Sequence, residues 1–234
     1  SAASDVYKRQ DYVYLCFDVN EETLPAAVAG LKTCGIRGFN LTMPNKNKIV
    51  ELLDELSPEA QLIGAVNTVL NDNGRLIGYN TDGYGFMQSV RDAGHDITGK
   101  NITVMGVGGA SMAICAQSSL DGAASVHIFA RRTSRYWNRT QKFAENLSAK
   151  TGCQVCLFDN DDHTALRDSI AQSYLLINAT SVGMVPDIDD TIIKDTSLFH
   201  PELVVADVVY EPQETRLLRE AKAAGCQTFN GMYM

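Results

Sequence analysis

The sequence is poor in basic residues and has no long apolar run. Lys and Arg together number 20 against 28 Asp and Glu, which gives a formal net charge of −8 over 234 residues. Non-specific binding to nucleic acid depends on clustered Lys and Arg, so this balance argues against a nucleic-acid partner. No apolar stretch approaches the roughly 20 residues that span a bilayer, and no signal peptide opens the chain, so we expect no membrane partner.

Histidine is scarce, and the cysteines are scattered. The four histidines show no ligand spacing, so we predict no metal site. Of the six cysteines only Cys153 and Cys156 are close together, in an alternating, strand-like run without a second pair. Packing in a strand explains this pair better than redox or metal chemistry does. A reducing, cytoplasmic location is therefore expected.

The apolar content is sufficient for real cores. Hydrophobic residues make up 45% of the chain and glycines number 18, which suits one large or two small α/β domains. Residues 1–10 are set aside, because residues 5–10 resemble the in-frame translation of a sequencing-library adapter. We expect this tail to be non-native.

The first part of the chain indicates a βαβα unit followed by a hairpin. The tetrapeptide Asn71-Asp72-Asn73-Gly74, between two short β runs, is a strong hairpin signal. The expected elements are a strand at residues 12–19, a helix at 24–33, a strand at 38–42, a helix from Pro44 to about residue 56, a short helix capped by Ser57 and Pro58, and hairpin strands at 65–70 and 75–79.

From residue 100 the pattern restarts with strands and helices in alternation. The expected strands lie at residues 101–105, 125–130, 153–158, 174–178 and 203–209. Such alternation predicts a parallel, doubly wound sheet. The fold class is therefore α/β: an N-terminal α/β domain at residues 11–82, followed by a Rossmann-type domain with a doubly wound parallel sheet at residues 83–234. Gly83 and Gly85, in the helix that joins the domains, are expected to permit hinging.

Lys46 occupies an unusual place for a cation. It follows Pro44 in the first turn of an expected helix, where the partial positive charge of the helix N-terminus favours anions. Ile49 and Leu53 place Lys46 on the inward side of that helix. A lysine there suits proton transfer, although a single lysine is more often a surface side chain that extends into water.

A glycine turn joins the strand at residues 101–105 to an apolar helix. Such a turn lets the backbone approach a pyrophosphate, which then rests on the helix N-terminus. Gly106, Gly108 and Gly109 depart from the G-x-G-x-x-G spacing, because Met112 occupies its last position. The turn therefore predicts a dinucleotide site, and an ordinary glycine-rich turn is the alternative.

Basic residues follow the next strand, where NAD-selective sites usually carry an acidic residue for the ribose. Arg131, Arg132 and Arg135 are interleaved with Thr133 and Ser134. Guanidinium groups bind phosphate bidentately, so this loop suits the 2′-phosphate of NADP. We predict NADP as the cofactor, with NAD possible; a solvated basic loop is the alternative.

Asp82 follows the hairpin at the junction of the two domains. Alone it is a candidate helix cap. Together with Lys46 it forms a potential acid–base pair, in which the carboxylate holds the lysine and shares its proton. Such a pair can move the proton of an alcohol while a nicotinamide takes the hydride.

Four motifs follow one another along the chain. They are Thr42-Met43-Pro44-Asn45-Lys46, Gly64-Ala65-Val66-Asn67-Thr68, Gly78-Tyr79-Asn80-Thr81-Asp82-Gly83 and the glycine turn at residues 106–111. In this order they resemble the motifs of the shikimate dehydrogenase family, and of its quinate/shikimate dehydrogenase branch in particular. The resemblance covers the chain from residue 11 to residue 234.

The resemblance implies roles for particular residues. Lys46 and Asp82 match the family's catalytic pair, and Thr42 and Asn67 match residues that bind the polyhydroxylated ring of the substrate. The N-terminal domain is then the substrate-binding domain. The implied cofactor residues are Gly106, Val107, Gly108, Gly109, Ala110 and Ser111 at the pyrophosphate, Ala130, Arg131, Arg132, Thr133 and Arg135 at the adenosine, and Ser181, Val208, Tyr210 and Gly231 near the nicotinamide.

The activity implied is the reversible, NADPH-dependent reduction of 3-dehydroshikimate to shikimate, a step of aromatic amino acid biosynthesis. The partner is a small polyhydroxylated cyclic carboxylate, and the protein is expected to be a monomer or homodimer. Two alternatives stay open at this point. One is an NAD-dependent quinate/shikimate dehydrogenase, and the other is a non-catalytic nucleotide-binding regulator of the same fold.

Three departures from the family pattern stand out. A serine pair that grips the substrate carboxylate would precede this chain, and a late glutamine would follow Met234, so we expect a fragment that lacks both native ends. Ala130 and Thr133 replace the usual asparagine and, in the quinate-type branch, the aspartate that favours NAD. The last departure favours NADP.

Overall fold

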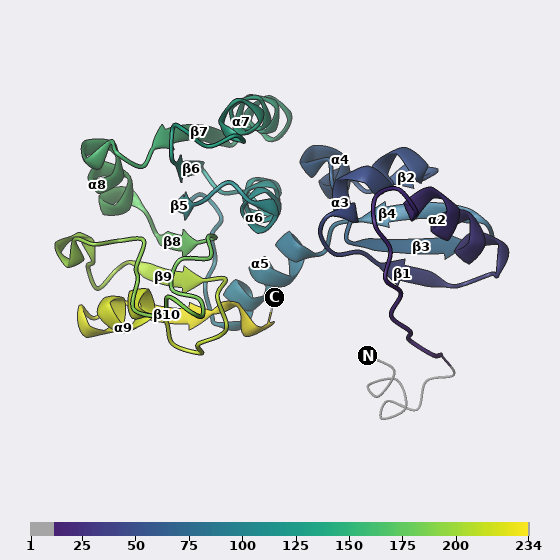
Figure 1. Ribbon diagram of the computed structural model, residues 1–234. Helices are drawn as coiled ribbons and strands as arrows, with labels where there is room; N and C mark the ends of the chain where they lie inside the picture. Colours follow the sequence, from purple (N-terminus) through teal and green to yellow (C-terminus); the bar gives the residue numbers. More distant parts are fainter. Residues whose placement is uncertain (1–11, 234) are drawn as a thin grey trace.

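Two sheets, joined by one helix, form the framework of the molecule (Figure 1). This computed structural model describes residues 12–233, so the proposed adapter-derived tail lies outside the described part. Helix α5 (Asp82–Asp92) runs between a four-stranded and a six-stranded sheet (Figure 1). The expected α/β fold class is confirmed, while the limits 11–82 and 83–234 stay predictions. Within the described residues, no helix has the length and apolar character needed to cross a membrane.

The first sheet is small and mixed. It has the order β1-β3-β4-β2, with β1 (Gly38–Asn40), β2 (Glu55–Leu56), β3 (Thr68–Asp72) and β4 (Arg75–Tyr79). The expected hairpin joins β3 to β4, and its two turn residues, Asn73 and Gly74, have the φ values of 53° and 92° that a type I′ turn requires. Helix α2 (Leu24–Thr33) forms over the predicted residues, and Ser57 caps α4 (Pro58–Ile63) by accepting a bond from the Ala60 N–H.

Two predictions for this domain were wrong. Residues 12–19 form no strand, and Val13 and Leu15 are 78% and 63% exposed. A strand needs a neighbour to satisfy its backbone, and no described strand pairs with this segment. The helix after Pro44 is also shorter than expected: α3 (Asn45–Lys48) continues as the 3₁₀ turn η1 (Ile49–Leu52) and then stops. Pairing of β2 with β4 overrides the helical spacing of the leucines.

The second sheet is parallel throughout, as predicted. Its order is β10-β9-β8-β5-β6-β7, with helices on both faces (Figure 1). The strands are β5 (Asn101–Met105), β6 (Ser125–Ala130), β7 (Gln154–Asp159), β8 (Leu175–Asn178), β9 (Val204–Asp207) and β10 (Gln227–Asn230). The helices are α6 (Gly109–Leu120), α7 (Trp137–Thr151), α8 (His163–Gln172) and α9 (Arg216–Ala223), with short 3₁₀ turns η2 (Thr196–Leu198) and η3 (Gly231–Tyr233).

The order of the strands places a ligand crevice beside β5. Strands later in the chain lie on both sides of it, β6 on one and β8 on the other. In open α/β sheets the crevice lies at this reversal, outside the carboxyl ends of the strands. The glycine turn leaves β5 at that point, between the ends of β6 and β8.

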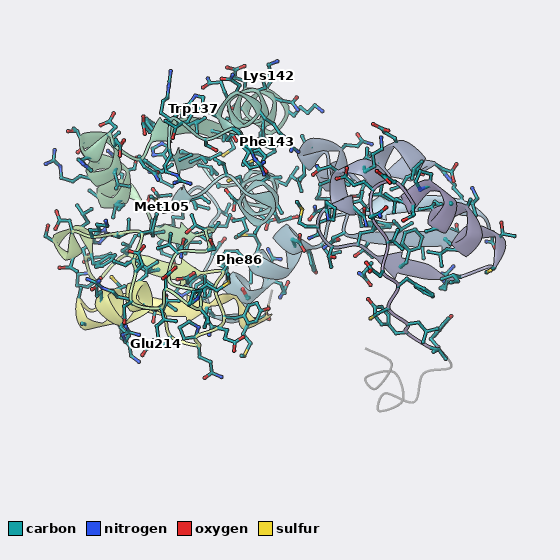
Figure 2. The ribbon with its side chains drawn as sticks, viewed as in Figure 1. Phe86, Met105, Trp137, Lys142, Phe143 and Glu214 are labelled. Atoms are coloured by element: carbon teal, nitrogen blue, oxygen red, sulfur yellow. The ribbon has the colours of Figure 1, made fainter. Side chains whose placement is uncertain are left out.

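The two domains share buried contacts. Ile63 and Ala65 of the first domain belong to the same hydrophobic cluster as Phe86 of α5, Ala113 of α6 and Phe143 of α7. Figure 2 labels Phe86 and Phe143. Gly83 makes the closest approach, because a Cβ at this position would overlap the backbone carbonyl of Ala113. Gly83 thus has a packing role inside a regular helix, and hinging at this residue stays a prediction.

Replacing Gly83 by alanine tests this contact. We expect Gly83→Ala to lower the free energy of unfolding by about 1–3 kcal/mol, because the new methyl group meets backbone that has no rotamer to change. Gly30→Ala is the matched control: Gly30 is also helical and exposed, with no atom within 4 Å of an added Cβ. That variant should gain about 0.5–1 kcal/mol. Equal effects of the two changes in chemical denaturation would contradict the close packing of α5 on α6.

Candidate active site

An ion pair brings together the two residues predicted to transfer a proton. Lys46 stands in α3 and Asp82 begins α5, and the Lys46 Nζ lies 2.7 Å from the Asp82 Oδ2. Their side chains are 23% and 24% exposed, so both are ordered by contacts and still reachable from solvent. The amine is therefore held by charge and hydrogen bonding in one place while it can reach a ligand.

Asn67 holds the other oxygen of the same carboxylate. Its Nδ2 donates to the Asp82 Oδ1 at 2.6 Å and to the Thr81 hydroxyl at 3.0 Å. Its Oδ1 accepts from the Thr81 N–H at 3.0 Å and from the Thr68 hydroxyl at 3.0 Å. The side chain is 8% exposed. Asn67 thus orients Asp82 in this structure, and a hydrogen bond to substrate would exchange one of these partners.

Thr42, the other predicted substrate ligand, lies on the turn that precedes α3. Its carbonyl accepts the Asn45 N–H at 3.0 Å, and its side chain is exposed. The structure brings Thr42 to the beginning of the helix that carries Lys46, without a direct bond to the pair. The Thr42 hydroxyl donates to the Met43 carbonyl at 3.4 Å, so a ligand oxygen near Lys46 would have to replace this contact to receive that hydrogen bond.

The glycine turn after β5 is built to leave backbone accessible. Gly106 has φ +111°, and a Cβ there would lie 2.8 Å from the Thr180 Cγ2. The buried Ser111 closes the turn from within by donating to the Gly106 carbonyl at 2.6 Å. Gly108 and Gly109, in contrast, have no atom within 4 Å of an added Cβ. This open backbone precedes the first turn of the twelve-residue helix α6, a geometry that fits an anionic pyrophosphate.

A cavity of about 500 Å³ lies at the reversal point of the parallel sheet. Six predicted cofactor residues line it together: Gly108, Gly109, Ala110, Ser181, Val208 and Tyr210. Gly231 lies behind this wall, where a Cβ would lie 2.6 Å from the Val208 carbonyl oxygen. Val107 packs against the core, and Ala130 is buried at the end of β6. The cavity combines open backbone with apolar walls, which suits a dinucleotide.

The predicted adenosine residues form an exposed loop beside β6. Arg131, Arg132, Thr133 and Arg135 all face solvent, outside the residues that line the cavity. Three guanidinium groups on five consecutive positions give this loop a local positive charge in an acidic protein. The loop is thus available to a phosphate group.

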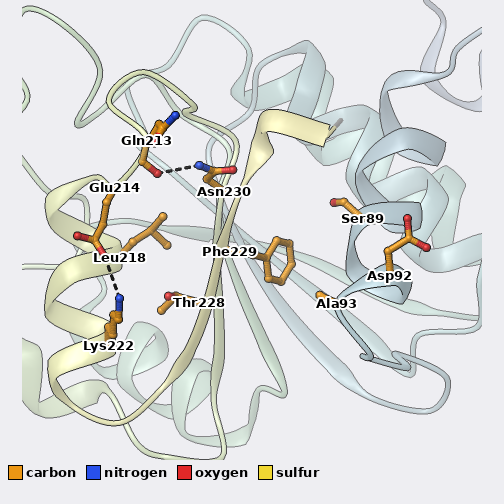
Figure 3. Close-up of a pocket in the computed structure, with 10 residues that line it drawn as sticks. All are labelled: Ser89, Asp92, Ala93, Gln213, Glu214, Leu218, Lys222, Thr228, Phe229 and Asn230. Carbon is orange, nitrogen blue, oxygen red and sulfur yellow. Dashed lines mark hydrogen bonds and ion pairs between the residues drawn. The ribbon is translucent and has the colours of Figure 1, made fainter.

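A second cavity, of about 540 Å³, lies between α5 and the edge formed by β10 and α9 (Figure 3). Its walls carry a Lys222–Glu214 ion pair of 3.4 Å, and the Asn230 Nδ2 donates to the Gln213 carbonyl at 2.7 Å (Figure 3). None of its lining residues belongs to the predicted site. Among the described residues, no group of three or more His, Cys, Asp or Glu side chains could hold a metal ion.

Sequence reasoning missed a buried pair that supports the cavity wall. Asn178 and Asp207 end the adjacent strands β8 and β9, and the Asn178 Nδ2 donates to the Asp207 Oδ1 at 3.0 Å. Asp207 also accepts the Val209 N–H at 2.9 Å and the Thr215 hydroxyl at 2.7 Å. Burial raises the pKa of the Asp207 carboxyl to about 6, although the hydrogen bonds oppose this shift. The available signal was a polar residue at the end of each apolar strand run.

Comparisons with known proteins identify the family of this chain. The family model described as the shikimate dehydrogenase substrate binding domain matches residues 4–69. A Listeria innocua protein named shikimate dehydrogenase (NADP(+)) is 49% identical over 224 residues, covering 96% of this chain and 77% of the relative. An Escherichia coli protein named quinate/shikimate dehydrogenase is 41% identical, covering 95% and 77%.

A solved structure shares the architecture as well as the sequence. Shikimate 5-dehydrogenase from Listeria monocytogenes, solved in complex with shikimate and NAD, matches with a TM-score of 0.96 and 46% identity. The match covers 98% of this chain and 79% of that structure. The similarity therefore includes both sheets and the helix between them.

The buried Asp207 predicts an unusual pH dependence of stability. Its pKa rises from 3.8 to about 6 on folding, so between these values the folded state binds more protons than the unfolded state. The Asp207 carboxyl contributes about 3 kcal/mol to the free energy of unfolding below about pH 4, and this contribution is lost as the pH rises through about 6. Asp207→Asn removes the titration, so the wild-type advantage over this variant should shrink across that window.

Chemical denaturation at a series of pH values measures this difference. Asp195→Asn is the control: Asp195 is exposed, and hydrogen bonds from Ser197 lower its pKa. The wild-type advantage over Asp195→Asn should therefore grow as pH rises. A wild-type advantage over Asp207→Asn that does not change with pH would contradict the raised pKa.

Proposed function

This chain belongs to the shikimate dehydrogenase family, and from that premise we propose that it reduces 3-dehydroshikimate reversibly to shikimate with NADPH. The observation that carries the proposal is the 2.7 Å pair of Lys46 and Asp82. Asp82 begins α5, and the next residue, Gly83, packs on α6, the helix that opens with the cofactor turn. The acid–base pair is thus tied by backbone contact to the nucleotide site.

Lys46 supplies the proton in the reducing direction. Its ammonium donates to the carbonyl oxygen of the substrate as that oxygen becomes a hydroxyl. NADPH, when bound, supplies the hydride for the carbon atom. In the oxidising direction the neutral Lys46 amine accepts the proton of the hydroxyl. Asp82 holds the amine in both states and shares its proton, and Asn67 fixes Asp82 from the opposite side.

The remaining predicted residues bind and orient. Thr42 and Asn67 would hydrogen-bond the hydroxyls of the polyhydroxylated ring, between the two domains. The turn at residues 106–111 would hold the pyrophosphate on the α6 N-terminus. Residues 130–135 would hold the adenosine end. The cavity wall of Ser181, Val208 and Tyr210, backed by Gly231, would flank the nicotinamide.

The preference for NADP over NAD is supported by the arginines after β6. Relatives at 49% identity carry NADP(+) in their names, whereas a solved relative at 46% identity holds NAD. In this chain no acidic residue occupies positions 130–135, where a carboxylate would repel the 2′-phosphate. A cytoplasmic location, a role in aromatic amino acid biosynthesis and a monomeric or homodimeric state stay predictions.

Quinate oxidation with NAD is the second candidate, favoured by the Escherichia coli relative that is named for both substrates. Initial rates with quinate and shikimate, each with both cofactors, separate the two. A non-catalytic regulator is disfavoured, because the complete Lys46–Asp82–Asn67 network would then serve no purpose.

Removing the Lys46 amine tests the mechanism. Lys46→Ala should lower turnover by roughly 10²- to 10⁴-fold, the usual contribution of a positioned acid or base. The KM for shikimate should change by less than about fivefold, because the amine acts mainly on the transition state. Lys48→Ala is the control, since Lys48 pairs with the exposed Glu51 on the other face of the helix. Near-normal turnover of Lys46→Ala would remove Lys46 from the mechanism.

Removing two arginines tests the cofactor. The double change Arg131→Ala and Arg132→Ala should weaken NADP binding on the order of 100-fold, since each charged hydrogen bond to phosphate contributes about 1.5–3 kcal/mol. NAD lacks that phosphate, so its binding should change little. Arg167→Ala, an exposed arginine on α8, controls for the loss of positive charge. Equal losses for both cofactors, measured by calorimetry, would defeat the NADP assignment.

A further inference from the structure

We propose that Trp137 and Tyr136 are positioning residues that select NADP, because their rings hold the arginines of the adenosine loop (residues 131–135) in place for the ribose 2′-phosphate. The proposal rests on the proposed cofactor site. It assigns the selectivity to two aromatic side chains that need not contact the cofactor.

The guanidinium of Arg132 lies over the indole ring of Trp137. The Arg132 Cζ lies 4.6 Å from the centroid of the indole, within the range of a cation–π contact. Trp137 (labelled in Figure 2) is 8% exposed and begins α7 close after the loop, so its ring is held by its surroundings. Arg132 is exposed to solvent. An exposed arginine otherwise loses considerable rotamer freedom when it binds a ligand. The indole removes part of that cost in advance.

Tyr136 holds the second arginine in a related way. The Arg135 Cζ lies 4.7 Å from its ring centroid, and one Arg135 nitrogen donates to the Tyr136 hydroxyl at 2.5 Å. A guanidinium carries five N–H donors, so the bond to the Tyr136 hydroxyl leaves further donors on Arg135 that can bind phosphate. Two of the three arginines are therefore oriented before any ligand arrives.

The backbone of the loop is ordered by its own bonds. The Ser134 carbonyl accepts the Trp137 N–H at 3.0 Å, and the Ser134 N–H donates to the Arg131 carbonyl at 2.9 Å. Asp159, which ends β7 opposite Ala130, accepts the Arg132 N–H at 3.4 Å. This nearby carboxylate is thus directed at backbone N–H groups beneath the loop. These hydrogen bonds order the backbone from which the Arg132 and Arg135 side chains extend.

Two adenosine nucleotides that differ only in the 2′-phosphate test the proposal on the whole chain. Calorimetry with adenosine 2′,5′-bisphosphate and with adenosine 5′-monophosphate isolates the contribution of that phosphate without any need for turnover. Trp137→Leu should weaken the bisphosphate about fivefold, which corresponds to a cation–π contact of about 1 kcal/mol, and the monophosphate by less than about twofold. Trp137→Phe, which keeps an aromatic face, should retain most of the difference.

Phe143→Leu is the control for a general disturbance of α7, because Phe143 is a buried aromatic residue on the same helix and belongs to the hydrophobic cluster, whereas the cation–π contacts of the loop arginines are made by Trp137 and Tyr136. It should lower stability and leave the ratio of the two affinities unchanged. A Trp137→Leu variant that loses affinity for both nucleotides equally, while the wild type still prefers the bisphosphate, would overturn the positioning role and leave the NADP preference intact. A wild type that binds both equally would overturn the NADP preference and this proposal together.

Discussion

The carboxylate of Asp82 connects the two domains of the molecule. One of its oxygens accepts a hydrogen bond from the Lys46 amine of α3, and the other accepts one from the Asn67 amide. The Asp82 backbone begins α5, the helix that leads into the second domain. The following residue, Gly83, has no side chain, which lets α5 meet the backbone of α6 one helical turn after the cofactor turn. Lys46, the proposed proton donor, is consequently placed relative to the glycine turn by backbone packing, which is stiffer than contacts between long side chains.

Buried polar residues give the cofactor side a comparable rigidity. Asn178 and Asp207 end neighbouring strands and bind each other, and each also bonds the loop that follows its own strand. A carboxyl in the interior is costly unless its hydrogen bonds are satisfied, and Asp207 receives three. The hydrogen bonds of Asn178 and Asp207 hold the loops that follow β8 and β9 in one conformation. These loops line the cavity at the carboxyl ends of the strands.

Much of the fold could be predicted because its signals are local. The strands at residues 101–105 and 125–130 agree with prediction at both ends, since a strand buried on both faces of a parallel sheet is rich in apolar residues and is bounded by turn residues. The hairpin follows from Asn73-Gly74. The failures depend on partners distant in sequence. Residues 12–19 have strand composition without a paired neighbour among the described strands, and Leu56, expected at the end of a helix, pairs with β4 as part of strand β2. Likewise Lys46 and Asp82 stand in recognisable motifs, whereas Asp207 gains its importance only from the loops that meet it.

Trp137 also makes this protein suitable for fluorescence measurements. It is the sole tryptophan among 234 residues, and the structure places it beside the guanidinium of Arg132. Tryptophan fluorescence therefore originates from one known location. The protein carries an intrinsic fluorophore beside the proposed adenosine loop, so nucleotide binding there can be followed by fluorescence titration or rapid mixing without attaching a dye.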